Sequence, residues 1–315
     1  RASWAFVVEP GSARTVHLDV DRRRATELVT RLRFQMEKWG FGEDYTRGRA
    51  VVMRETVDRH LTMIGELLWE PLGLDGERLE RVTVVPHGPL HSLPFHALRL
   101  ADGSALVDHC LVAYLPSAST RRYLGASTID DRSSVLAVGV TDASIPLVEH
   151  ELETVRGAFR RGEVLAGEAA TRQRFAASIE GADVVHIATH GVFREDDPHF
   201  SALRLADGWL SLYDLYGLRT GAALVCLSAC QSGRSWVSGG DELVGLVRGF
   251  LHAGAASLIV SLWPVQDAST ARLMSDLYRR QRAGATPPQA LREAMLALRD
   301  TDPHPYHWAP FVAIG

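Results

Sequence analysis

The stretch VVHIATHG at residues 184–191 decides the fold of this chain, together with LVCLSACQSG at residues 224–233. Each is a run of apolar, largely β-branched residues, typical of a buried strand, and each ends in a reactive side chain. Glycine follows His190 at once and follows Cys230 within three residues. The two side chains are 40 residues apart, which leaves room for a crossover between neighbouring parallel strands. The pattern therefore predicts an imidazole and a thiol side by side at two strand ends.

Working outward from these runs, strands and helices alternate after a polar segment at residues 125–134. Strands are expected near residues 135–140, 164, 183–189, 222–228, 257–262 and 309–314, and helices near 147–160, 172–179, 242–253, from about 268 and from about 288. Such alternation is typical of an α/β fold with a mostly parallel sheet and helices on both faces. Ligands of these sheets bind at the carboxyl ends of the strands, where His190 and Cys230 are expected.

The first 130 residues have a different pattern. A hairpin is expected over residues 4–20 around Pro10 and Gly11, helices over 21–39 and 50–69, and short strands over 81–86 and 110–115. The polar segment at 125–134 is the best boundary, so we expect one unit over residues 1–130 and another over residues 131–315.

Composition argues against several classes of protein. The 315 residues are 46% hydrophobic and carry a formal net charge of -4, so no basic excess favours binding to nucleic acid. No apolar run approaches the roughly 18 residues of a membrane span, and the N-terminus lacks a signal-peptide pattern. Three cysteines, two of them in or at the end of one core strand, fit a reducing compartment. We therefore expect a cytoplasmic protein with no membrane or nucleic-acid partner.

The chemistry of the pair favours cysteine catalysis. A free thiol has a pKa near ~8.5 and is only a few per cent thiolate at neutral pH, so an imidazole that takes the proton raises the reactive fraction. Gly191, having no Cβ, lets its backbone N–H approach a substrate carbonyl, and the N–H of Cys230 offers a second oxyanion donor. Zinc is the competing interpretation, with His186 and Cys226 as further ligands. It fails because residues four apart on a strand are about 13 Å apart. No metal or cofactor is assigned.

Several motifs resemble the CHAT family, caspase-like domains that often follow tetratricopeptide repeats and are related to separase. The likeness extends over ATHG at 188–191, LSAC at 227–230 and residues 87–98, 246–255, 261–265 and 305–311. It implies a caspase-like three-layer fold with strand order 2-1-3-4-5-6, preceded by a degenerate caspase-like subdomain. It also implies a cysteine endopeptidase with His190 and Cys230 as its dyad, gated by an upstream repeat segment or a partner. A protein substrate is implied, possible settings being bacterial defence or programmed cell death with a gasdermin-like effector.

Specificity follows from the same resemblance. In the separase-like pattern an acidic residue after the fifth strand faces the side chain that precedes the cut, and Asp267 stands there, favouring Arg or Lys. The alternative is that Asp267 caps the next helix. Asp142 matches a substrate-binding position of caspases, and a role within a turn is its alternative. No third catalytic residue can be assigned, since the acidic run at residues 195–197 either orients His190 or is solvated loop.

Two other functions are compatible with the sequence. One is a catalytically idle caspase-like scaffold that binds a peptide or protein in the same cleft. The other is a small-molecule thiol hydrolase or amidase, which would need a closed pocket. Selective alkylation of Cys230 over Cys110 and Cys226 would indicate an activated thiolate.

Overall fold

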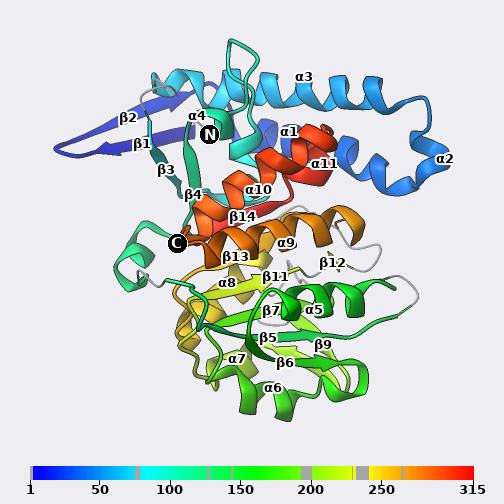
Figure 1. Ribbon diagram of the computed structural model, residues 1–315. Coiled ribbons are helices and arrows are strands. Elements are labelled where there is room, and N and C mark those ends of the chain that lie inside the picture. Colours follow the sequence, from blue (N-terminus) through cyan, green and yellow to red (C-terminus); the bar gives the residue numbers. More distant parts are fainter. Residues whose placement is uncertain are drawn as a thin grey trace.

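A mostly parallel sheet dominates the computed structural model, and both parts of the chain contribute strands to it (Figure 1). The structure describes residues 3–74, 79–125, 128–142, 145–192, 201–228, 230–231, 241–263, 265 and 267–315, and only the backbone of residues 123, 230, 231, 241–244 and 267. Within these residues the large sheet has eight strands, in the spatial order β3 (Arg81–Val84), β4 (Leu111–Tyr114), β14 (Phe311–Ile314), β13 (Leu258–Ser261), β11 (Leu224–Leu227), β7 (Val184–Ala188), β5 (Ser134–Gly139) and β6 (Arg161–Ala166).

The order of the last six strands confirms the expected topology. Numbered along the chain from β5, they lie in the order 2-1-3-4-5-6. All neighbours among them pair in parallel except β13 and β14, which are antiparallel. Strands β7 and β11 are buried along their whole length, because helices cover both faces, and this explains why their sequences are continuous apolar runs.

Helices complete three layers. α5 (Val148–Gly157), α9 (Asp267–Arg282) and α10 (Pro287–Thr301) pack side by side on one face. The other face carries α6 (Arg172–Ile179), α7 (Leu212–Tyr216) and α8 (Asp241–Ala253) (Figure 1). The chain passes outward from β5 to β6 through α5, and then back across the sheet to β7, β11 and β13 through α6, α7 and α8. Because crossovers between parallel strands are right-handed, this reversal of direction puts the second set of helices on the opposite face from α5. The expected α/β three-layer architecture is therefore confirmed.

The first part of the chain packs onto the same core. Its elements are the isolated hairpin of β1 (Ser3–Glu9) and β2 (Ser12–Leu18), and the helices α1 (Arg22–Glu37), α2 (Glu43–Thr46), α3 (Ala50–Leu68) and α4 (Leu106–His109). Asp21 caps α1, its carboxylate accepting a hydrogen bond of 2.7 Å from the backbone N–H of Arg24. Buried Leu28 and Leu61 belong to one hydrophobic cluster with the strands of the sheet. The last helix, α11 (Pro305–Trp308), precedes β14.

A second, smaller sheet lies where the strands β7 and β11 end. Among the described residues its strands are β10 (Gly208–Ser211), β9 (Ala202–Leu205), β8 (His190–Val192) and β12 (Cys230–Gln231), in that spatial order. β8 follows β7 and begins at His190, and β12 follows β11 and begins at Cys230, so both residues lie in the small sheet beyond the ends of two neighbouring strands of the large one.

Candidate active site

The backbone brings His190 and Cys230 opposite one another. β7 and β11 are parallel neighbours in register, with Ile187 paired with Leu227. Beyond their carboxyl ends β8 pairs in parallel with β12, and Cys230 is the register partner of His190. Register partners on adjacent strands have α-carbons about 5 Å apart. The predicted juxtaposition of the two positions at one sheet edge is thus present in the backbone, while the side chain of Cys230 lies outside the described part.

His190 is held by a carboxylate. Its ring is 7% exposed, and its Nε2 lies 2.6 Å from Oδ2 of Asp142, whose side chain is about half exposed. An ionised carboxylate can only accept, so Nε2 donates this hydrogen bond and Nδ1 is the basic nitrogen of the neutral ring. The contact was not anticipated from the sequence, which placed Asp142 among substrate-binding residues. The acidic run at 195–197, considered for the orienting role, lies outside the described residues.

Asp142 reaches His190 because β5 lies beside β7. Gly139 at the end of β5 is the register partner of Ala188 at the end of β7. A Cβ on Gly139 would collide with the backbone oxygen of Ala188 and with the side chain of Val148, so glycine permits the close approach of the two strands. The chain after β5 turns at Asp142, whose carbonyl accepts a hydrogen bond of 3.2 Å from the N–H of Ile145. The sequence signal for this role was the position of Asp142 just after a strand predicted to flank β7.

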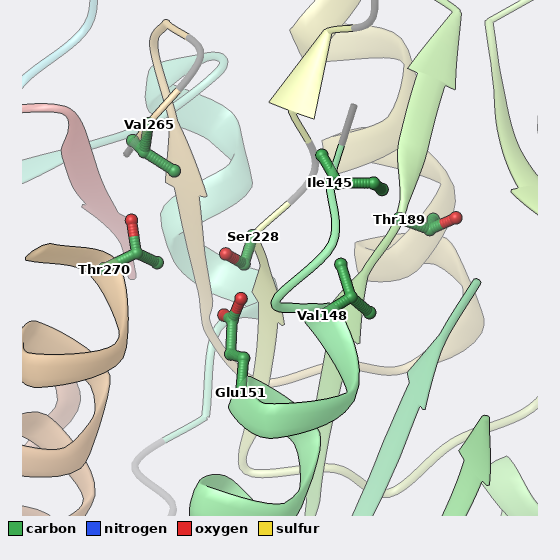
Figure 2. Close-up of a pocket in the computed structure, with 7 residues that line it drawn as sticks. All are labelled: Ile145, Val148, Glu151, Thr189, Ser228, Val265 and Thr270. Carbon is green, nitrogen blue, oxygen red and sulfur yellow. The ribbon is translucent and has the colours of Figure 1, made fainter. Parts of the chain in front are cut away.

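A pocket opens beside the pair. Its cavity volume is about 10 Å³, and its wall combines residues from four places: Ile145, Val148 and Glu151 at and before α5, Thr189 next to His190, Ser228 two residues before Cys230, and Val265 and Thr270 at and before α9 (Figure 2). Glu151 is only 7% exposed, and Thr270 is 2% exposed. Sequence reasoning missed this pocket because no motif links residues from these four segments.

Glu151 belongs to a buried network beneath the pocket. Its Oε1 lies 2.9 Å from Nε2 of His186, and Nδ1 of the same ring lies 2.8 Å from the hydroxyl of Tyr278. Burial alone lowers the pKa of His186, but neighbouring Cys226 and the Glu151 carboxylate raise it, to about 10. The contact with the Glu151 carboxylate thus favours the protonated form of the His186 ring. Cys226 is fully buried, and its Sγ lies 3.6 Å from Sδ of Met274, as expected for a core residue.

The remaining predicted site positions are described only in part. Gly191 lies in β8, where it pairs with Gln231 and with Leu203, next to the backbone of Cys230. Asp267 is the first residue of α9, close in sequence to Val265 and Thr270 of the pocket. Its side chain lies outside what the structure describes.

Over the described residues, no three histidine, cysteine, aspartate or glutamate side chains gather as a metal site. Nor does that part contain a helix both long and apolar enough to cross a bilayer.

Comparison with known proteins agrees with this architecture. The family model described as the CHAT domain matches residues 58–315. Tetratricopeptide repeat protein 28 of Mus musculus is 30% identical over 191 residues, which are 48% of this chain and 8% of that protein. Its Homo sapiens counterpart is 28% identical over 191 residues, with the same shares covered. The chain thus spans less than a tenth of the length of these curated relatives.

A solved structure shares the fold. The Saccharomyces cerevisiae separase–securin complex superposes with a TM-score of 0.53 at 15% sequence identity, covering 74% of this chain and 15% of that chain. At this identity the likeness is one of architecture, and it agrees with the caspase-like, separase-like fold implied by the sequence motifs.

Proposed function

Because the chain belongs to the CHAT domain family, we propose that it is a cysteine endopeptidase with Cys230 as nucleophile and His190 as base. The single observation that carries the proposal is the register pairing of these two positions beyond the ends of β7 and β11. A thiol is a weak nucleophile until it loses its proton, and an adjacent imidazole takes that proton. A scaffold without chemistry has no need for the two groups at matched positions beside a pocket.

The proposed reaction uses both nitrogens of His190. Nδ1 takes the thiol proton, and the thiolate adds to the carbonyl carbon of the scissile peptide bond. The imidazolium then gives its proton to the leaving amine as the C–N bond breaks and a thioester forms. A water molecule, deprotonated by the same ring, attacks the thioester and restores the thiol. Asp142, bonded to Nε2, holds the ring in the tautomer whose Nδ1 is basic, and it stabilises the imidazolium.

The oxyanion of each tetrahedral intermediate needs hydrogen-bond donors. We assign this role to the backbone N–H groups of Gly191 and Cys230, which lie on the adjacent short strands β8 and β12. One such donor contributes roughly 3 kcal/mol to lowering the barrier.

Substrate choice and regulation are proposed from the family resemblance. Asp267, at the start of α9, would face the side chain before the cut and favour a basic residue. The substrate would be a protein, and an upstream repeat segment or a partner would gate the enzyme. The name of the curated relatives includes tetratricopeptide repeats, which supports an upstream repeat segment as the regulator. Bacterial defence or programmed cell death, with a gasdermin-like effector as substrate, is the proposed setting.

The decisive experiment compares the wild-type chain with Cys230→Ala on a mixed peptide library read by mass spectrometry. Cuts present with the wild type and absent with the variant support a cysteine peptidase. Cys110→Ala is the matched control, because Cys110 is buried and burial raises its pKa to about 11, so this thiol stays protonated at neutral pH. Cleavage retained in Cys230→Ala would contradict the assignment. A library left uncut, with Cys230 no more reactive to iodoacetamide than Cys110, would favour the idle peptide-binding scaffold.

A further inference from the structure

The pocket beside the candidate dyad has the location of a specificity pocket. Thr189 is adjacent to His190 in the chain, and Ser228 precedes Cys230 by two residues, so both strands that carry the reactive positions also line the pocket. A substrate whose scissile carbonyl lies between the dyad and the oxyanion donors would therefore direct its neighbouring side chain into this opening. This step rests on the function proposed above.

Oxygen atoms make the floor of the pocket polar. The Glu151 carboxylate points toward the hydroxyl of Ser228, and Thr270 lies across from them on α9 with its methyl group turned toward them (Figure 2). Across the described residues Oγ1 of Thr270 is buried and makes no hydrogen bond. A buried hydroxyl without a partner is costly, and a donor group from a ligand would satisfy it. Ile145, Val148 and Val265 supply apolar walls suited to a methylene stem.

The floor distinguishes between the two basic side chains. Arg binds carboxylates best through two parallel hydrogen bonds to both oxygens, whereas the Lys ammonium is a compact group with three donors. Oε1 of Glu151 is already engaged by His186 at 2.9 Å, so only Oε2 is left for a ligand. The cavity volume of about 10 Å³ matches a single water-sized group, which is the size of an ammonium and much smaller than a guanidinium.

We propose that this pocket receives the side chain before the scissile bond and selects Lys over Arg, with Glu151 as the specificity-determining residue. The ammonium fills the cavity, where it donates to Oε2 of Glu151, to the hydroxyl of Ser228 and, once that side chain rotates, to the hydroxyl of Thr270. The methylene stem lies at the opening of the cavity against its apolar walls. The preference for a basic residue proposed from the family resemblance is separate from this choice, and the floor of the pocket selects between the two basic residues.

The test uses three peptides that differ only before the cut, carrying Lys, Arg or Met there. The expected kcat/KM for the Lys peptide exceeds the other two at least about tenfold, the factor that one charge-assisted hydrogen bond supplies. Glu151→Gln keeps the side-chain size and an acceptor for His186, and should reduce the Lys peptide's advantage about tenfold. Thr270→Val removes a single acceptor without adding volume and should reduce it less. Glu153→Gln, at an exposed position of the same helix, is the matched control.

Alkylation of Cys230 by iodoacetamide tests the endopeptidase proposal apart from the pocket proposal, because this small probe does not need to enter the pocket. Thermal unfolding of each variant verifies that it is folded. If Glu151→Gln does not fold, the comparison of the Lys and Arg peptides is made with Thr270→Val. Selective alkylation and cleavage, with the Arg peptide cut as fast as the Lys peptide, would overturn the pocket proposal and leave the endopeptidase standing. A Lys preference unchanged in both pocket variants would also overturn it. Failure of alkylation and of all cleavage would overturn both proposals.

Discussion

At the scale of single residues, His190 is defined by the contact that orients it. The 2.6 Å hydrogen bond from Nε2 to Asp142 leaves Nδ1 as the nitrogen that accepts the proton in the proposed reaction, which requires that nitrogen to face the thiol. Asp142 is half exposed, so water competes for its carboxylate and weakens its electrostatic effect relative to a buried aspartate.

The first prediction concerns this positioning residue. Asp142→Asn should lower kcat about 10- to 100-fold, because the ring remains in place but its tautomer is no longer specified. This loss is smaller than the roughly 10⁴-fold that complete removal of a general base can cause. Asp142→Glu should restore part of the rate, since it returns a carboxylate. Steady-state kinetics with one cleavable peptide give the measurement. A rise in KM with unchanged kcat would instead support the substrate-binding role predicted from the sequence.

Short motifs at two strand ends predicted the juxtaposition of His190 and Cys230, which the backbone register confirms, while their chemistry stays a prediction. His190 and Cys230 could be paired from their positions at strand ends, because the carboxyl ends of neighbouring parallel strands meet. Asp142 and Glu151 could not be assigned their contacts, since these depend on how closely β5 and α5 approach β7, a distance that no local pattern encodes.

At the scale of elements, the close approach of β5 and β7 determines the site. Gly139 and Ala188 are register partners, and a Cβ on the glycine would collide with the partner strand's backbone. The strand order implied by the CHAT resemblance predicted that these strands are neighbours. It did not reveal that a single absent side chain allows Asp142 to reach the imidazole.

The second prediction tests this contact between strands. Gly139→Ala should destabilise the fold by about 1–3 kcal/mol, the usual cost of overpacking, and should reduce cleavage further because the segment with Asp142 shifts away from His190. Gly157→Ala is the control, because a Cβ there meets nothing within 4 Å. Urea unfolding and peptide cleavage are measured on both variants. Equal stability of Gly139→Ala and the wild type would refute the steric argument.

At the scale of the whole molecule, the first and last parts of the chain are joined through buried histidines. His96 lies 3.3 Å from the hydroxyl of Tyr114 on β4 through Nδ1, and 3.2 Å from the carbonyl oxygen of Ala309 through Nε2. Burial lowers the pKa of His96 to about 4 and that of His304 to about 3, despite the hydrogen bond of His96 to Ala309. Both rings are thus neutral in the folded protein at pH 7.

The third prediction is an acid sensitivity of the fold. His96 has a pKa of about 4 in the folded chain and 6.5 in the unfolded chain, so the unfolded chain binds the proton more readily. Its contribution to the free energy of unfolding is therefore fully present above pH 6.5 and is lost as the pH falls from 6.5 through 4. For His96 the loss is about 3 kcal/mol. The free energy of unfolding of His96→Gln, measured in urea from pH 7 to 4, should decline less steeply than that of the wild type. His17→Gln, on the exposed hairpin, should follow the wild type.

The sequence by itself determined the alternating architecture and the juxtaposition of His190 and Cys230, because buried parallel strands require continuous apolar runs and bring their carboxyl ends to one edge. The strand order followed from the resemblance to the CHAT family. The two-unit division at residue 130 stays a prediction, although β3 and β4 join the same sheet as the later strands. Only the tertiary structure decided which carboxylate holds His190 and which one forms the floor of the pocket. Those contacts join side chains from β7, β8, α5, α9 and the segment after β5, and their distances come from packing, which local sequence patterns do not specify.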